Sequence, residues 1–170
     1  MQRIGIYPGT FDPIHNGHLA FALEATKQCR LDKVILLPEQ LPRSKHNVTP
    51  VLERVQQIKA AALHHPSVDV QLLSSSQFTV RTTLAEIQKR FEHKKLTLLV
   101  GSDVALGLHK WNGIEMLIAT CDVAVGLRSN ETVEDVQRQF EKLSAMCPTT
   151  NFTIITTNYS SLSSSSFRGK

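Results

Sequence analysis

The chain has 170 residues, of which 41% are hydrophobic and 20% are charged, as in an ordinary globular protein with a sizeable core. The net charge of +4 comes from 19 basic and 15 acidic residues, and the basic residues adjoin only in pairs. This scatter favours a small anionic substrate over a nucleic-acid groove. No apolar run reaches membrane-spanning length and no signal-peptide pattern opens the chain, so we expect a cytoplasmic protein without membrane or nucleic-acid partners.

Apolar runs alternate regularly with segments of helical periodicity. The strands are expected at Arg3–Tyr7, Lys33–Leu37, Val68–Leu72, Leu96–Val100, Asp122–Val125 and Phe152–Thr156. The helices are expected near Gly17–Cys29, Val51–His64, Val80–His93, Val104–Ile118 and Thr132–Met146. This order predicts an α/β fold: one Rossmann-like, doubly wound domain over residues 1–170, with a parallel sheet of five to six strands flanked by helices.

The first strand leads through Tyr7-Pro8-Gly9-Thr10-Phe11-Asp12-Pro13-Ile14-His15-Asn16-Gly17-His18-Leu19 into the first helix. A small turn with hydroxyl and imidazole donors therefore lies where a helix presents free N–H groups, an arrangement that suits a phosphate chain. His15 and His18, with a glycine between them, can face one ligand. A Pro/Gly-rich connection with two solvent-facing histidines is the alternative, and the thirteen-residue pattern disfavours it.

Four later segments are also candidates, each with a plainer interpretation. The loop around Lys45 can be a solvated, proline-rich surface loop. Thr79 fits a helix N-cap that needs no substrate. Trp111, the single tryptophan, fits a core position. The serine-rich segment before Phe167 can be disordered. The three cysteines (Cys29, Cys121 and Cys147) have no metal-ligand spacing and are read as reduced thiols, and no metal-binding residue is predicted.

Together these residues resemble the HxGH nucleotidyltransferase superfamily and, within it, most closely the bacterial nicotinate-nucleotide adenylyltransferases. The opening segment is similar to GGTFDPIHxGHL, and Leu37-Pro38-Glu39-Gln40-Leu41-Pro42-Arg43-Ser44-Lys45 to PxxxPPHK. Phe78-Thr79-Val80-Arg81-Thr82-Thr83-Leu84 is similar to YTx[DQ]TL, Gly101-Ser102-Asp103 followed by Trp111 to G[AS]D…W, and Leu162-Ser163-Ser164-Ser165-Ser166-Phe167-Arg168 to ISSTxIR.

The resemblance implies transfer of AMP from ATP to nicotinate mononucleotide, releasing pyrophosphate and nicotinic acid adenine dinucleotide, an enzyme of NAD biosynthesis. It implies catalytic roles for His18, His15, Lys45 and Arg168. It implies ATP contacts by Gly9, Thr10, Phe11, His15, His18, Asp103, Ser163, Ser164, Ser165 and Arg168, and acceptor contacts by Lys45, Thr79, Thr82 and Trp111. Mg²⁺ is expected to arrive with ATP and to be held mainly by polyphosphate and water.

Departures from the pattern at Pro8, Arg43, Ser44 and Arg81 leave alternatives open. One is another adenylyl- or cytidylyltransferase of the superfamily, with phosphopantetheine or nicotinamide mononucleotide as acceptor. The other is an inactive nucleotide-binding relative. The chain ends two residues after Arg168, where a helix usually follows in the family, so we expect a shortened or truncated C-terminal end. A homo-oligomer is a further open alternative.

Overall fold

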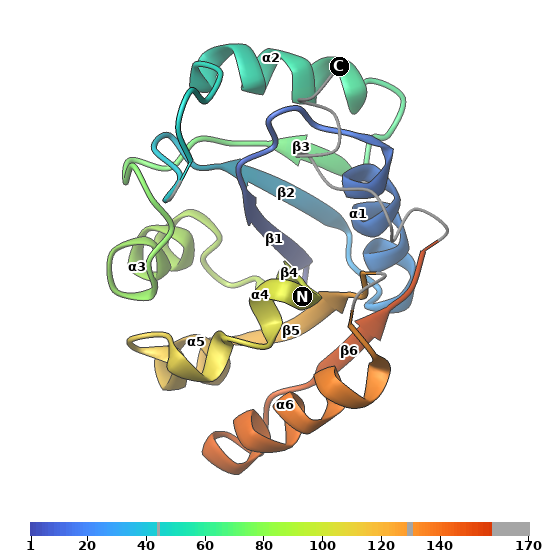
Figure 1. The fold of residues 1–170 in the computed structure, drawn as a ribbon, viewed down its shortest axis with the longest axis vertical. Helices are drawn as coiled ribbons and strands as arrows, with labels where there is room; N and C mark the ends of the chain where they lie inside the picture. Colours follow the sequence, from blue (N-terminus) through green and yellow to red (C-terminus); the bar gives the residue numbers. More distant parts are fainter. Residues whose placement is uncertain (44, 129–130, 158–170) are drawn as a thin grey trace.

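The computed structural model describes residues 1–43, 45–128 and 131–157. Its sheet has six parallel strands in the order β3-β2-β1-β4-β5-β6 (Figure 1). The strands are β1 (Arg3–Gly9), β2 (Lys33–Pro38), β3 (Val68–Val70), β4 (Lys95–Gly101), β5 (Cys121–Gly126) and β6 (Phe152–Ile155). The predicted α/β fold with a doubly wound parallel sheet is therefore confirmed, and each predicted strand is present with ends shifted by one or two residues.

The helices are α1 (Asn16–Gln28), α2 (Val51–Ala61), α3 (Val80–Arg90), α4 (Ser102–Ala105), the 3₁₀ helix η1 (Leu108–Lys110), α5 (Ile114–Thr120) and α6 (Val133–Met146). The prediction of one helix over Val104–Ile118 is wrong, because the segment is divided into α4, η1 and α5. Gly113 has φ +85, a left-handed conformation that ends the preceding turn and starts α5. The break matters because it leaves Trp111 and Asn112 in a loop between η1 and α5, at the same cavity as the carboxyl end of β4.

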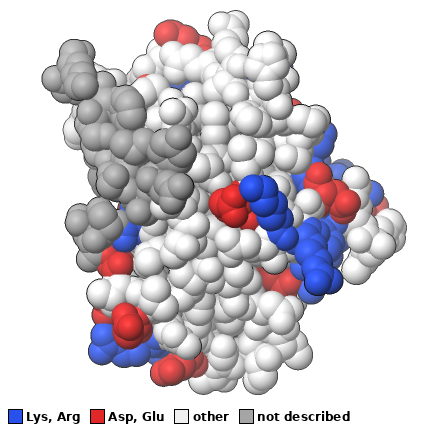
Figure 2. Space-filling view, turned by 90° about the vertical axis from the view of Figure 1, so that its right-hand side faces the viewer, with Lys and Arg blue, Asp and Glu red and all other residues white. Residues whose placement is uncertain are grey.

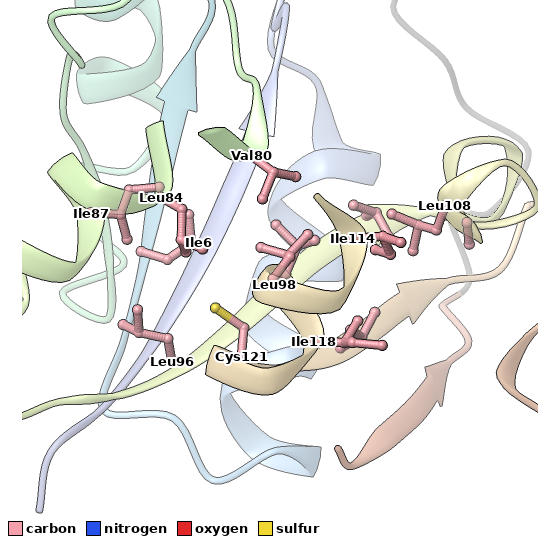
Figure 3. Close-up of a cluster of buried hydrophobic side chains, with 14 of the residues drawn as sticks. Ile6, Val80, Leu84, Ile87, Leu96, Leu98, Leu108, Ile114, Ile118 and Cys121 are labelled. Atoms are coloured by element: carbon pink, nitrogen blue, oxygen red, sulfur yellow. The ribbon is translucent and has the colours of Figure 1, made fainter. Parts of the chain in front are cut away.

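Helices cover both faces of the sheet. Because successive residues of a strand point to opposite faces, neighbouring residues pack against different helices. Leu98 of β4 belongs to a buried cluster that also contains Leu84 of α3 and Ile114 of α5 (Figure 3). Its neighbour Leu99 belongs to a second cluster, which contains Phe21 of α1 and other residues of α1 and α2. The two clusters fix the strand register, since a shift by one residue would exchange the faces.

The strand order reverses between β1 and β4, which are neighbours although they are far apart in sequence. From this point the chain builds outward through β2 and β3 on one side and through β5 and β6 on the other. In open parallel sheets, ligands bind in the crevice beyond the carboxyl ends of the strands at such a switch point. That position lies beyond Gly9, where β1 ends, and Gly101, where β4 ends.

On the face drawn in Figure 2, small groups of Lys and Arg side chains lie beside Asp and Glu side chains, and most of the surface is neither. In α1, Lys27 Nζ forms an ion pair with Glu24 Oε1 at 2.8 Å. None of the helices in the described ranges is both long and apolar enough to cross a membrane.

Candidate active site

A cavity of about 850 Å³ opens at the switch point of the sheet. Its walls come from the end of β1, the loop after β2, the start of α3, the end of β4 and the loops after α4 and β5. The predicted site residues that line it are Gly9, Thr10, Phe11, His18, Lys45, Thr79, Asp103 and Trp111. The fold thus brings together residues from five separate sequence segments, which spacing alone could not place at one cavity.

His15 and His18 form a reciprocal cap at the start of α1. Gly17 N–H donates to His15 Nδ1 at 3.1 Å, and His15 N–H donates to His18 Nδ1 at 3.2 Å. Their rings are stacked, with centroids 3.7 Å apart and planes 21° apart. Because Nδ1 accepts a backbone hydrogen bond in each neutral ring, the proton is on Nε2. Both rings are buried, and His18 lines the cavity whereas His15 does not.

Both histidines are neutral at pH 7. Burial lowers the pKa of His18 to about 3, and the positive charges of His15, Arg128 and Lys45 add to that effect. Burial, with a contribution from Arg128, lowers the pKa of His15 to about 4. The site therefore offers imidazole N–H donors already oriented by the backbone, in a surrounding positive field. An incoming polyphosphate would raise both pKa values, because its negative charge favours the protonated rings.

Aromatic rings support His18 from behind. Phe11 is 1% exposed, and its ring meets His18 edge to face at a centroid distance of 5.0 Å and Tyr7 at 5.1 Å. A Cβ at Gly9 would lie 3.0 Å from the Phe11 ring, so a larger residue at this strand end would force the ring to shift. Tyr7 is buried in the cavity wall, and burial raises its pKa above the ordinary value, so its hydroxyl stays protonated.

Thr10 and Lys45, from the two loops predicted to bind phosphate, are in direct contact. Lys45 Nζ donates to Thr10 Oγ1 at 2.9 Å. A lysine ammonium and a hydroxyl in one wall of the cavity, on the same side as His18, form a donor set suited to phosphate oxygens.

Arg54 of α2 holds these two loops together and was missed by the sequence analysis. It is fully buried, and its guanidinium donates to the carbonyl oxygens of Thr10 at 2.6 Å, Glu39 at 2.8 Å and Thr49 at 2.8 Å. A single charged residue in an amphipathic helix carries no sequence signal of burial, because such residues are usually on the solvent face. Arg54 is a positioning residue for the loop that carries Thr10.

Asp103, the second residue of α4, lines the cavity beside Arg128 from the loop after β5. Arg128 Nη1 is 3.6 Å from Asp103 Oδ2, and both side chains are more than a third exposed. An ion pair this exposed stabilises the protein by at most about 1 kcal/mol, so a substrate group can replace either partner.

Ser102 is fully buried. Its hydroxyl accepts from Arg128 N–H at 3.0 Å and donates to Glu131 at 2.9 Å. It therefore anchors the loop after β5. The sequence analysis also missed Arg128, and the available signal was its position three residues after the end of the predicted strand Asp122–Val125.

Trp111 lines the cavity together with its neighbours Lys110 and Asn112. Trp111 packs against the buried core with one side, and its ring lies 6.2 Å from that of Phe78. Core packing and cavity lining, which the sequence presented as alternatives, are thus both features of this residue.

Thr79 lines the cavity and also caps α3, accepting from Thr82 N–H at 3.3 Å. Thr82 itself does not line the cavity. The predicted residues Ser163, Ser164, Ser165 and Arg168, as well as Ser44, lie outside the described residues.

The arrangement can bind an extended anion that carries a planar group. Donors from His18, Thr10, Lys45 and Arg128, the Asp103 carboxylate and the Trp111 ring all line the cavity. This set of groups suits positioning and charge stabilisation.

Comparison with known proteins points to the same class of site. Residues 6–170 match the model of the cytidylyltransferase-like family. The chain is 34% identical to the nicotinate-nucleotide adenylyltransferase of Bacillus subtilis over 124 residues, which are 69% of this chain and 65% of that protein. It is 30% identical to a protein of Clostridium novyi named "probable nicotinate-nucleotide adenylyltransferase", over 84% of this chain and 74% of that one.

A solved structure confirms the fold independently of sequence. The nicotinic acid mononucleotide adenylyltransferase of Plasmodium falciparum, complexed with NaAD, superposes with a TM-score of 0.76. The superposition covers 98% of this chain and 82% of that one, at 16% sequence identity. The likeness therefore concerns the backbone architecture.

Proposed function

This chain belongs to the cytidylyltransferase-like family, and we propose that it transfers AMP from ATP to nicotinate mononucleotide. The products are nicotinic acid adenine dinucleotide and pyrophosphate. The observation that carries the proposal is the joint lining of one cavity by His18, Thr10, Lys45 and Trp111. The relatives named nicotinate-nucleotide adenylyltransferase support the choice of acceptor.

In the reaction, a phosphate oxygen of the acceptor attacks the α-phosphorus of ATP. The new P–O bond forms as the bond to pyrophosphate breaks, and pyrophosphate leaves with the electron pair. Phosphoryl-type transfer needs little covalent help from the protein, so positioning and charge stabilisation supply most of the rate. His18 donates from Nε2 to the α-phosphoryl oxygens, where negative charge increases in the transition state.

Thr10 and Lys45 hold the phosphate chain. In the free protein the Lys45 ammonium is hydrogen-bonded to the Thr10 hydroxyl, so both groups already face the same region of the cavity. His15 keeps His18 in the tautomer that donates from Nε2. Ser163, Ser164, Ser165 and Arg168 hold the β- and γ-phosphates in this proposal, as their resemblance to the family motif implies.

Asp103 accepts from the ribose hydroxyls of ATP after leaving its weak ion pair with Arg128. The pyridine ring of the acceptor lies beside Trp111. Trp111 stacks on the pyridine ring, supported from behind by Phe78. Thr79 borders the ring at the start of α3.

Magnesium enters with ATP in this proposal. In the described part of the chain, no group of three or more His, Cys, Asp or Glu residues could hold a metal ion. The ion would therefore be coordinated mainly by polyphosphate and water, and it would neutralise phosphate charge. No step assigned to His18, Lys45 or Asp103 depends on its position.

The test is a pyrophosphate-release assay with ATP and Mg²⁺ and four acceptors: nicotinate mononucleotide, nicotinamide mononucleotide, phosphopantetheine and water alone. We expect the highest kcat/KM with nicotinate mononucleotide. His18→Ala should lower kcat by about 10²–10³-fold with an unchanged circular dichroism spectrum, because one preorganised donor is lost. His64→Gln, at an exposed turn, is the matched control and should keep the wild-type rate.

Two results would contradict the proposal. Faster turnover with phosphopantetheine would assign the chain to another branch of the superfamily. ATP binding without pyrophosphate release for every acceptor would indicate an inactive nucleotide-binding relative.

A further inference from the structure

We propose that a second cavity, at the amino ends of the central strands, binds a small anion that carries one phosphate group. This cavity shares no lining residue with the active-site cavity. Arg3 lines the second cavity and Gly9 lines the first, and the seven-residue strand β1 keeps them about 20 Å apart. Binding at the second cavity does not require the reaction assigned to the first.

The second cavity has a volume of about 210 Å³. It lies on the face of the sheet that α1 covers, since Lys95 and Thr97 share the side of β4 on which Leu99 packs in the cluster with α1. Residues 28–30, at the end of α1, form another wall. Sites for drug-sized ligands usually measure about 300–1,000 Å³, so this cavity suits a small ion or a short metabolite.

Positive charge exceeds negative charge in the walls of this cavity. Arg3, Arg30 and Lys95 line it, and among the described lining residues Asp122 carries the single carboxylate. Both oxygens of Asp122 are engaged: Oδ2 lies 2.9 Å from Lys95 Nζ and 3.9 Å from Arg3 Nη2, and Oδ1 accepts from Asn151 Nδ2–H at 3.1 Å. Within the described ranges, Arg30 has no ion-pair partner. Three cations therefore share one carboxylate, which leaves a positive field for an anion.

Two hydrogen-bond donors at this cavity are buried without a partner. Thr97 is 2% exposed, and its hydroxyl has no hydrogen-bond partner in the part of the chain that the structure describes. Nε of Arg3 is also buried and unpaired there, although the backbone N–H of the same residue donates to Asp32 Oδ2 at 2.7 Å. Buried polar groups are normally paired, because an unmade hydrogen bond costs free energy. An acceptor bound in the cavity is the partner that we infer for them.

This set of donors fits a phosphate group better than a carboxylate. Two guanidinium groups, one ammonium group and one hydroxyl line the cavity. A carboxylate has two oxygens in one plane, whereas a phosphate group has at least three around a tetrahedral centre and can accept from several walls at once. Arginine in particular pairs with phosphate through two parallel N–H···O bonds. Free phosphate and the phosphate monoester of a short metabolite share this chemistry.

The experiment titrates inorganic phosphate into the ¹⁵N-labelled full chain and follows the amide signals by NMR. Sodium chloride at equal ionic strength is the reference. We expect saturable shifts at Arg3, Arg30 and Thr97. Shifts at Gly9 and Thr10 report separately on the active-site cavity, so one titration distinguishes the two sites. A parallel titration with glycerol 3-phosphate identifies the source of the phosphate group, since the tighter binder of the two is the better model of the ligand.

Two variants test the assigned donors. Arg30→Gln should weaken phosphate binding at the second cavity about tenfold, because a charged hydrogen-bond donor is lost. Thr97→Val replaces a hydroxyl by a methyl group of similar size and should weaken binding about fivefold. Lys59→Gln removes an exposed charge from α2 and lines neither cavity, so this matched control should bind phosphate like the wild type. Thermal unfolding checks that each variant is folded.

Three results would overturn the inference: phosphate shifts confined to the active-site cavity, equal shifts with chloride, or an affinity of Arg30→Gln within twofold of the wild type. The measured quantity is binding rather than turnover. Failure here would therefore leave the proposed adenylyl transfer intact, and absence of pyrophosphate release would not bear on the second cavity.

Discussion

The low pKa values of His15 and His18 predict that acidification destabilises the protein well above the range in which carboxylates titrate. In the unfolded chain each histidine has a pKa near 6.5, whereas in the folded protein His18 titrates at about 3 and His15 at about 4. Between these values the unfolded state binds more protons than the folded state. Stability is therefore complete above about pH 6.5 and decreases as the pH falls.

The magnitude follows from the two protonation equilibria. Between pH 7.0 and pH 5.5 a histidine with an unfolded pKa of 6.5 that stays neutral when folded loses about 1.3 kcal/mol of stabilisation. The two residues together give about 2.5 kcal/mol. Glu24 and Asp135, whose pKa values are lowered by hydrogen bonds from Lys27 and Thr132, respectively, contribute only at lower pH.

The assay is urea unfolding followed by circular dichroism at pH 7.0 and pH 5.5. His18→Asn replaces the titrating ring by an amide whose oxygen can accept from His15 N–H as Nδ1 does. Its free energy of unfolding should change by only about 1.3 kcal/mol between the two pH values, because one titrating group remains. The exposed-site variant His64→Gln should behave like the wild type. Equal wild-type stability at both pH values would refute the assigned protonation states.

Four other substitutions test separate parts of the site. Arg54→Leu should lower the free energy of unfolding by about 3–5 kcal/mol in urea unfolding, because buried carbonyl groups lose their donor, and a loss below 1 kcal/mol would show that the loops do not need it. Lys45→Ala and Trp111→Ala should each raise the KM for the pyridine nucleotide about tenfold, and an unchanged KM in either variant would contradict the acceptor contact assigned to that residue. Ser102→Ala should speed amide hydrogen exchange around Arg128, and unchanged exchange would mean that the loop after β5 is held by other contacts.

Much of the site could be predicted because its motifs are local. The turn from β1 into α1 contains His15 and His18 three residues apart, and the cap that they form depends only on that spacing. Thr79 was likewise recognised as a helix cap from its immediate neighbours. The division of the predicted Val104–Ile118 helix was not foreseen, because glycine lowers helix propensity without showing which backbone conformation it adopts.

Another residue of the site has no local signal. Arg54 is 44 residues from Thr10, the residue whose carbonyl it holds, and an arginine in a helix of mixed polarity is normally exposed.

The sequence by itself determined the alternation of strands and helices, the histidine turn and the family, because hydrophobic period and short motifs act over a few residues. Only the tertiary structure decided that β1 and β4 are neighbours and that one cavity is shared by Lys45, Asp103, Arg128 and Trp111. The physical reason is that strand order depends on burial of both faces of the sheet at once. That burial is a property of the whole chain, which no single segment encodes.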